Sequence, residues 1–216
     1  MIIFIHIPKT AGTSIFDWLR KATGNKLSWY SRENTPEMFF RDPENRKRFL
    51  AYGGHFDYGQ VKPYLAPDDF VFSVVREPVE LAASHYNQIA VRDGKHPLHQ
   101  VTVGKTLIEA AKDDKKLFGE LSNNQCWYLS RQREFAKAWP IIEEYKPNLY
   151  TMRQLDQLTR DISNVFGLAG VPDLPRSNTS ETDYFDRLSR EEIDFLRQVN
   201  HEDALLYVKA GGYQPA

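Results

Sequence analysis

The N-terminal segment constrains the fold more than any other part of the chain. The apolar run from Ile2 to Ile7 is rich in β-branched residues and ends at Pro8, which is typical of a short strand buried on both faces of a parallel sheet. A helical pattern then begins at Gly12, and Gly24 marks its predicted end. A buried strand, a short turn and a helix form the repeating unit of folds that alternate strands and helices.

Further units of the same kind follow along the chain. Residues 70–75 predict a second buried strand, and Glu77-Pro78 starts a helix with proline in the tolerated first turn. Residues 50–55 and 148–152 are two more candidate strands, and Ser189 opens a capping box before a helix that ends ahead of Gly211. The alternation predicts an α/β fold, a three-layer doubly wound parallel sheet whose ligands bind beyond the carboxyl ends of the strands.

Composition bounds the size of the protein and its class of partner. The chain has 216 residues, 41% of them apolar, which at about 100 to 200 residues per domain predicts one domain over residues 1–216. Lys and Arg total 28 against 29 Asp and Glu, so no strong overall field attracts nucleic acid or an anionic membrane. Any anion site must therefore be local.

Two features bear on the compartment. Cys126 is the only cysteine, so no intramolecular disulfide can form, and a buried thiol is the plain interpretation. The N-terminal apolar run is too short for a signal peptide or a membrane span. We therefore expect a soluble, cytoplasmic protein.

The turn after the first strand predicts an anion site. Unpaired backbone N–H groups and the positive end of the helix dipole attract phosphate at such a place. Lys9 can put its ammonium on that phosphate, and Thr13 and Ser14 can donate hydroxyl hydrogens. The alternative is an ordinary turn with a solvated lysine and Thr13 as N-cap.

The turn differs from the phosphate loop of magnesium-dependent enzymes. A Walker A loop ends in Gly-Lys-Ser/Thr, whereas here Thr13 follows Gly12 directly. A magnesium-dependent NTPase would also offer an acidic residue at the end of a neighbouring strand, where this chain has Arg76. Arginine repels a metal ion and attracts a phosphate, so the pattern predicts a site without a metal.

Two segments resemble the donor site of a known enzyme family. Residues 6–14, His-Ile-Pro-Lys-Thr-Ala-Gly-Thr-Ser, resemble the 5′-phosphosulfate loop of carbohydrate-type sulfotransferases, which include the heparan and dermatan sulfate 2-O-sulfotransferases. Residues 74–86 are similar to the family's 3′-phosphate motif, in which an arginine and a serine eight positions later hold the 3′-phosphate of the donor. Arg76 and Ser84 stand at those positions, and eight helical residues return to nearly the same face after about two turns.

The resemblance implies a P-loop-like sulfotransferase fold and the donor 3′-phosphoadenosine-5′-phosphosulfate, with adenosine 3′,5′-bisphosphate as product. The donor-binding residues that it implies are Lys9, Thr10, Ala11, Gly12, Thr13, Ser14, Arg76 and Ser84. It further implies that Lys9 stabilises the charge growing on the leaving phosphate, without a metal ion.

A weaker part of the resemblance concerns the acceptor. Residues 52–59 look like the Gly-His segment that carries the family's catalytic base, so His55 is the implied base. Imidazole, with an ordinary pKa of about 6.5, is largely neutral at pH 7 and can accept a proton. The alternatives are a structural hydrogen bond for His55 and, for the glycines at 53 and 54, either close approach to a ligand or an ordinary turn. Residues 123–129 and 200–207 resemble a family segment near the acceptor and the closing helix.

Other residues have weaker claims on the site. His6 is expected to hydrogen-bond the loop, and His85 to contact a neighbouring carbonyl. Four aromatic residues could stack on a sugar or a base, although such residues more often belong to the core: Trp29, Tyr30, Trp127 and Tyr128.

The sequence thus predicts a sulfotransferase that acts in line on a hydroxyl of a saccharide or another small acceptor. The resemblance around Gly54-His55 implies a carbohydrate acceptor. The overall charge near zero argues against a long polyanion, and the basic runs at 46–48 and 112–116 are typical of solvated faces, so a neutral or lightly charged glycan is the first expectation. Two alternatives are a P-loop-type kinase of small molecules, which would need magnesium and an acidic ligand, and a nucleotide-binding module without catalysis.

Overall fold

The computed structural model describes residues 1–92, 94–144, 148–168, 174 and 184–212. One five-stranded sheet, in the order β2-β3-β1-β4-β5, runs through the described part of the chain, and every neighbouring pair of strands is parallel. The strands are β1 (Ile2–Ile5), β2 (Leu27–Trp29), β3 (Ala51–Gly54), β4 (Phe70–Val75) and β5 (Asn148–Thr151). The predicted α/β fold with a parallel sheet is confirmed.

Helices connect these strands. They are α1 (Gly12–Ala22), α2 (Pro36–Arg41), α3 (Glu44–Arg48), α4 (Tyr58–Val61), α5 (Pro78–Asn87), α6 (His99–Thr102), α7 (Leu107–Asp113), α8 (Lys115–Leu121), α9 (Asn124–Ser130), α10 (Phe135–Glu144), α11 (Leu155–Phe166), α12 (Arg190–Val199) and α13 (His201–Lys209). Among the described residues, none of these helices combines the length and apolar character needed to cross a bilayer.

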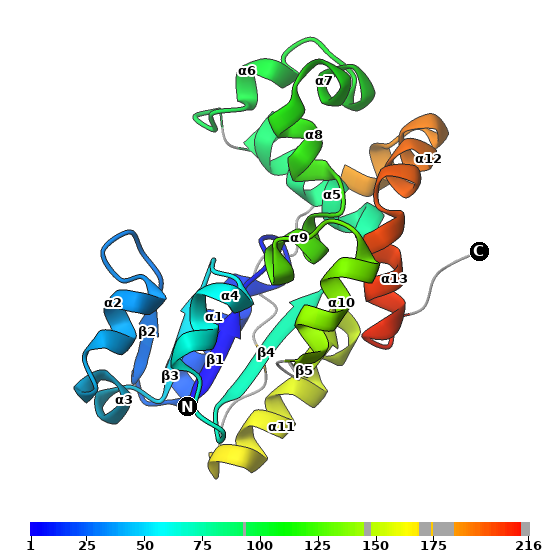
Figure 1. The fold of residues 1–216 in the computed structure, drawn as a ribbon. Coiled ribbons are helices and arrows are strands. Elements are labelled where there is room, and N and C mark those ends of the chain that lie inside the picture. The colour runs from blue at the N-terminus through cyan, green and yellow to red at the C-terminus, as the bar shows by residue number, and fades with distance from the viewer. Residues whose placement is uncertain (93, 145–147, 169–173, 175–183, 213–216) are drawn as a thin grey trace.

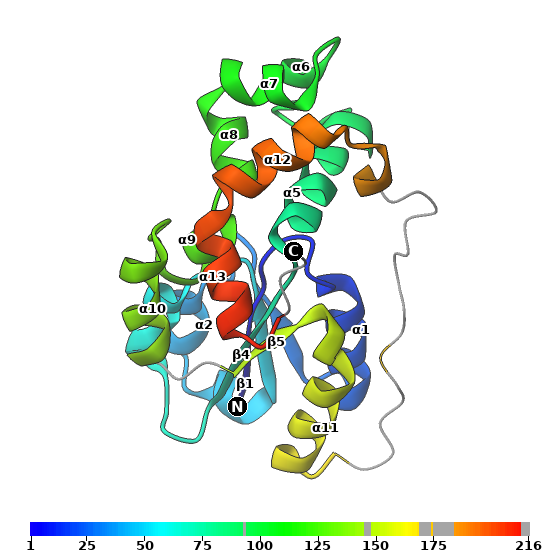
Figure 2. The same cartoon turned by 90° about the vertical axis from the view of Figure 1, so that its right-hand side faces the viewer.

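The sheet lies between two layers of helices, which gives the predicted three layers (Figure 2). Helices α1 and α11 cover one face, where the stacked rings of Phe4 and Phe72, 4.7 Å apart, pack with Trp18 of α1. Helices α9, α10 and α13 cover the other face. A third group, α5 to α8 with α12, rises beyond the carboxyl end of β4 (Figure 1) and has its own apolar cluster.

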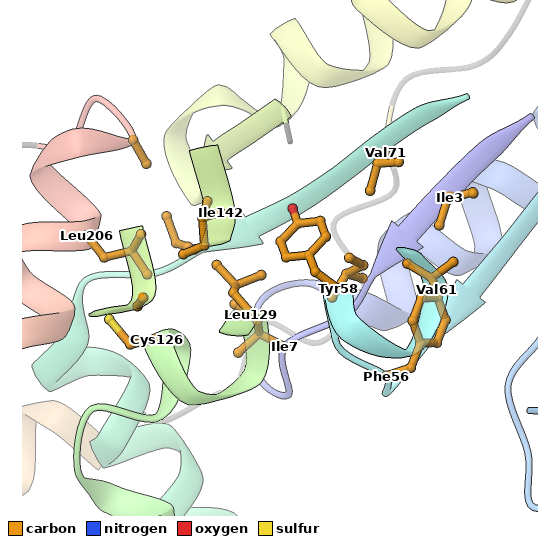
Figure 3. Close-up of a cluster of buried hydrophobic side chains, with 14 of the residues drawn as sticks. Ile3, Ile7, Phe56, Tyr58, Val61, Val71, Cys126, Leu129, Ile142 and Leu206 are labelled. Carbon is orange, nitrogen blue, oxygen red and sulfur yellow. The ribbon is translucent and has the colours of Figure 1, made fainter. Parts of the chain in front are cut away.

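The face under α9, α10 and α13 carries the larger core (Figure 3). Ile3 and Val71 of the sheet share one buried cluster with Leu129 and Ile142 of the covering helices. Cys126 is also buried in this cluster, and burial raises the pKa of its thiol. Cys126 is therefore the buried thiol that the sequence predicted.

The structure differs from the sequence prediction in two elements. Strand β2 was not predicted, because three half-buried residues at the sheet edge carry too short a pattern. The capping box at Ser189 is confirmed, but the helix predicted from there to Gly211 is divided into α12 and α13. The division falls at Asn200, whose side-chain amide donates to the carbonyl of Leu196 at 2.9 Å.

Candidate donor and acceptor site

Three adjacent strands bring the predicted site residues to one edge of the sheet. Strands β3, β1 and β4 are parallel neighbours, so their carboxyl ends meet at that edge. His55 follows β3, the loop with Lys9 follows β1, and Arg76 follows β4. The chain builds β2 and β3 on one side of β1 and then crosses to β4 on the other. The edge is therefore the switch point at which doubly wound folds bind their ligands.

The loop between β1 and α1 has a backbone suited to an anion. Lys9 and Ala11 both have left-handed conformations, with φ of 69° and 61°. Such conformations cost about 1–3 kcal/mol each for residues other than glycine, and they cluster at functional sites. The hydroxyl of Thr10 is buried and donates to the carbonyl of Ile7 at 2.7 Å, which closes the loop. The N-cap position belongs to Ala11, so the alternative with Thr13 as N-cap is wrong.

Gly12 is required by the ring of His6. A Cβ atom at residue 12 would lie 1.9 Å from Nε2 of His6, so the imidazole fills the space beneath the start of α1. His6 is buried, and neither of its ring nitrogens has a hydrogen-bond partner among the described residues. The expected hydrogen bond from His6 to the loop is therefore wrong, because the ring packs against Gly12 and, with ring centres 4.5 Å apart, against His55.

The burial of His6 has an electrostatic consequence. Burial, together with the repulsion of a positive charge by the nearby His55 and Lys9, lowers the pKa of His6 to about 3. His6 is thus neutral at physiological pH, and its uncharged ring packs against the loop at Gly12.

The depressed pKa of His6 predicts acid-sensitive folding. Between pH 6.5 and about 3 the unfolded chain binds a proton at this imidazole and the folded chain does not, so the free energy of unfolding falls as pH falls through that window. The contribution is fully present above pH 6.5. In urea titrations between pH 4 and 6, His6→Leu should flatten the pH slope of unfolding by about 1.4 kcal/mol per pH unit. The exposed His201, changed to Leu, serves as control, and an unchanged slope in the His6 variant would contradict this assignment.

His55 has one ring nitrogen engaged. Its Nδ1 lies 3.1 Å from the carbonyl oxygen of His6. Because a carbonyl only accepts, this hydrogen bond puts the proton on Nδ1 and leaves Nε2 as the basic nitrogen. Partial burial lowers the pKa of His55 below 6.5, although the bond to the His6 carbonyl acts in the opposite direction. The structural hydrogen bond of the alternative interpretation thus exists, and it leaves Nε2 available for base chemistry.

The glycines before His55 are explained by packing against β2. A Cβ atom at Gly54, where φ is 142°, would lie 2.4 Å from Cβ of Tyr30. A Cβ atom at Gly53 would lie 2.7 Å from the indole of Trp29. The space beside these glycines is therefore filled by aromatic side chains of the protein, not left for a ligand.

The side chain of Lys9 reaches the helix that follows Arg76. Its Nζ donates to Oε1 of Gln88 at 3.3 Å, just beyond the last residue of α5. Sequence reasoning gave Gln88 no role. A signal was present, because Gln88 follows Ser84 by four residues, as Ser84 follows Arg76 by eight, and such spacings lie along one side of a helix.

Arg76 lies just before the start of α5, and Ser84 lies within α5, on the side of the helix that leads to Gln88. Nε of Arg76 donates to Oε2 of Glu80 at 3.2 Å, so the two side chains form an ion pair. Ser84 is half-buried, one turn after Glu80. An anion placed here would compete with the Glu80 carboxylate for the guanidinium.

Two of the residues with weaker claims on the site, His85 and Tyr128, have defined contacts in the structure. Nδ1 of His85 lies 3.2 Å from the carbonyl oxygen of Glu120, as expected for a histidine that contacts a carbonyl. The ring of Tyr128 lies 6.5 Å from that of His55, and burial raises the pKa of Tyr128 to about 12. Tyr128 is therefore a neutral phenol beside the candidate base.

Two other aromatic candidates, Trp29 and Trp127, are half-buried and pack against groups of the protein. Trp29 packs edge-on against Phe16 with ring centres 4.9 Å apart, as a core residue would. The ring of Trp127 has the guanidinium of Arg131 at 5.0 Å and that of Arg133 at 5.2 Å. Within the described residues, no group of three or more His, Cys, Asp or Glu side chains is placed to hold a metal ion.

The chain matches a known protein family over most of its length. The model of the sulfotransferase family matches residues 1–210, which include the loop between β1 and α1, the five strands described above and helices α12 and α13. A search of curated proteins finds no match to the chain.

Proposed function

The chain belongs to the sulfotransferase family, and we propose that it transfers the sulfuryl group of 3′-phosphoadenosine-5′-phosphosulfate to a hydroxyl of a saccharide or another small acceptor. The family match also bears out the P-loop-like fold. The observation that carries the proposal is that Lys9, Arg76 and His55 follow the carboxyl ends of β1, β4 and β3, which are neighbours in the parallel sheet.

The loop fits the 5′ end of the donor. In the proposal, the backbone N–H groups at the start of α1 and the ammonium of Lys9 bind the 5′-phosphate, with the hydroxyls of Thr13 and Ser14 as further donors. The remaining residues of the proposed cradle are Thr10, Ala11 and Gly12. The hydroxyl of Thr10 is already used to close the loop, so Thr10 contributes its backbone and the shape of the turn.

The start of α5 fits the 3′-phosphate. The planar guanidinium of Arg76 suits phosphate oxygens, and the hydroxyl of Ser84 adds one donor on the same side of the helix. Glu80 holds the guanidinium when no phosphate is bound.

The proposed reaction moves one sulfuryl group and one proton. The acceptor oxygen attacks sulfur and forms the new S–O bond, while Nε2 of His55 takes the hydroxyl proton. The bond between sulfur and the bridging oxygen breaks, and its electron pair stays on the 5′-phosphate. Lys9 stabilises the charge that grows there, so positioning and electrostatics supply most of the rate acceleration.

A neutral or lightly charged glycan remains the proposed acceptor, with a lipid or metabolite hydroxyl as the second choice. The basic run at 46–48 offers little to a polyanion, because Arg46 pairs with Asp69 at 2.8 Å and Lys47 with Glu44 at 2.6 Å. The neutral phenol of Tyr128 next to His55 is a suitable neighbour for a sugar hydroxyl.

Nucleotide binding tests the proposal directly. Calorimetry should show that adenosine 3′,5′-bisphosphate binds at least about tenfold more tightly than 5′-AMP or ADP, because each charge-assisted hydrogen bond to the 3′-phosphate contributes about 1.5–3 kcal/mol. Arg76→Ala should abolish this preference and leave the fold intact. Arg41→Ala, which removes an exposed arginine, should keep it. Equal affinities for the three nucleotides in the unmodified protein would refute the donor site.

A further inference from the structure

Arg76 is held through its backbone by a residue from a distant helix. Oε1 of Gln125 accepts the N–H of Arg76 at 2.9 Å, and Nε2 of Gln125 donates to the carbonyl of Arg76 at 3.0 Å. Gln125 is fully buried. The contact lies where β4 has ended and α5 has not begun, so these two bonds orient the segment from which the guanidinium projects.

The backbone of Gln125 is itself held by helix α13. The N–H groups of Gln125 and Cys126, in the first turn of α9, donate to the two carboxylate oxygens of Asp203, both at 2.8 Å. Asp203 is fully buried and belongs to the first turn of α13. Its carboxylate therefore caps α9 from a segment almost 80 residues away and offsets the positive ends of both helices.

The capping is reciprocal. Oδ1 of Asn123 accepts the N–H groups of Glu202 and Asp203, both at 3.2 Å, and so caps α13. Oδ1 of Asn200 accepts the N–H of Asn123 at 2.9 Å, and its amide donates to the carbonyl of Leu121 at 2.7 Å. These hydrogen bonds join α9 to α13, which lie next to each other in Figure 2. Residues 123–129 and 200–207, which resemble the family's acceptor segment and closing helix, are thus joined into one polar junction. The side chain of Gln125 connects this junction to Arg76.

We propose that Gln125 is a positioning residue for Arg76, and that the junction of α9 with α13 sets the preference of the enzyme for a 3′-phosphorylated nucleotide. The inference rests on the proposed function, since it assumes that Arg76 binds the 3′-phosphate. A glutamine suits this role because one short amide both accepts from an N–H and donates to a carbonyl. A side chain without that pair of groups leaves two backbone groups buried and unpaired, and the peptide is free to turn.

The matched control lies next to Gln125 on the same helix. Asn124 is also buried, and its amide contacts the carbonyl of Glu120, not Arg76. Replacing either residue removes one buried amide from α9. A purely structural role predicts the same outcome for both variants, namely lower thermal stability and an unchanged ratio of nucleotide affinities.

The experiment measures affinities for adenosine 3′,5′-bisphosphate and 5′-AMP by calorimetry in the full chain. Gln125→Met, which keeps the length of the side chain, should weaken binding of the bisphosphate about tenfold, the scale on which supporting residues of ligand sites act, and change 5′-AMP affinity less than about twofold. Asn124→Leu should keep the ratio of the unmodified protein. If Gln125→Met does not fold, Gln125→Asn, whose amide is one methylene too short to reach Arg76, should show the same selective loss.

The outcomes separate the two proposals. A folded Gln125 variant that keeps the full preference for the bisphosphate overturns the positioning role and leaves the donor site standing. A parallel loss of affinity for both nucleotides also overturns it, because the 5′-phosphate loop does not depend on Arg76. If the unmodified protein shows no preference, the proposed donor site fails, and the positioning role fails with it.

Discussion

His55→Ala should lower turnover by about a hundredfold or more, the usual scale of lost general-base catalysis, with donor affinity nearly unchanged. The expectation follows from the hydrogen bond between Nδ1 and the His6 carbonyl, which leaves Nε2 as the basic nitrogen of the ring. Initial rates with labelled donor against glycans, phenols, steroids and amines measure the effect. Transfer only to phenols or amines would contradict the proposed class of acceptor.

An asparagine at the same position separates base chemistry from structure. His55→Asn keeps an N–H that can donate to the His6 carbonyl, but its amide cannot take a proton, so turnover should be as low as in His55→Ala. In the unmodified enzyme, activity should persist below pH 6.5 and fall as pH drops through the lowered pKa of His55. A fully active asparagine variant would show that the hydrogen bond, and not proton transfer, is what His55 supplies.

Lys9→Ala should reduce turnover by about a hundredfold to a thousandfold, as removal of one donor to a developing oxyanion does, and weaken donor binding much less. The ammonium meets most of its charge in the transition state, when the bridging oxygen leaves with its electron pair. Rates and donor affinities should be compared in the presence of EDTA. Lys21→Ala, an exposed lysine on α1, is the control.

Two outcomes would change the interpretation of Lys9. Unchanged turnover in Lys9→Ala would remove the lysine from the mechanism. A strict requirement for magnesium in the unmodified enzyme would favour the kinase alternative, because a metal ion would then meet the charge that we assign to Lys9.

The elements that depend on residues close together in the sequence could be predicted from the sequence. Strand β1 is a continuous apolar run, β4 is interrupted only by Ser73, and the capping box at Ser189 joins groups three residues apart. The alternation of strands and helices predicts a parallel sheet but not the order of its strands, because parallel pairing joins segments that are distant in the sequence. Strand β2 escaped prediction for the same reason, since three residues gain their structure from pairing with β3.

The candidate site divides in the same way. The sequence by itself determined the loop with Lys9 and the spacing of Arg76 and Ser84, because each lies within one turn or one helix. Only the tertiary structure decided that the ring of His6 lies under Gly12.

The contacts that orient the other two candidate residues also come from the tertiary structure. The carbonyl of His6 selects the basic nitrogen of His55, 49 residues away, and Gln125 holds Arg76 across another 49 residues. Local patterns carry information about conformation within a few residues, whereas a buried hydrogen bond between distant segments exists only after the apolar core has brought them together.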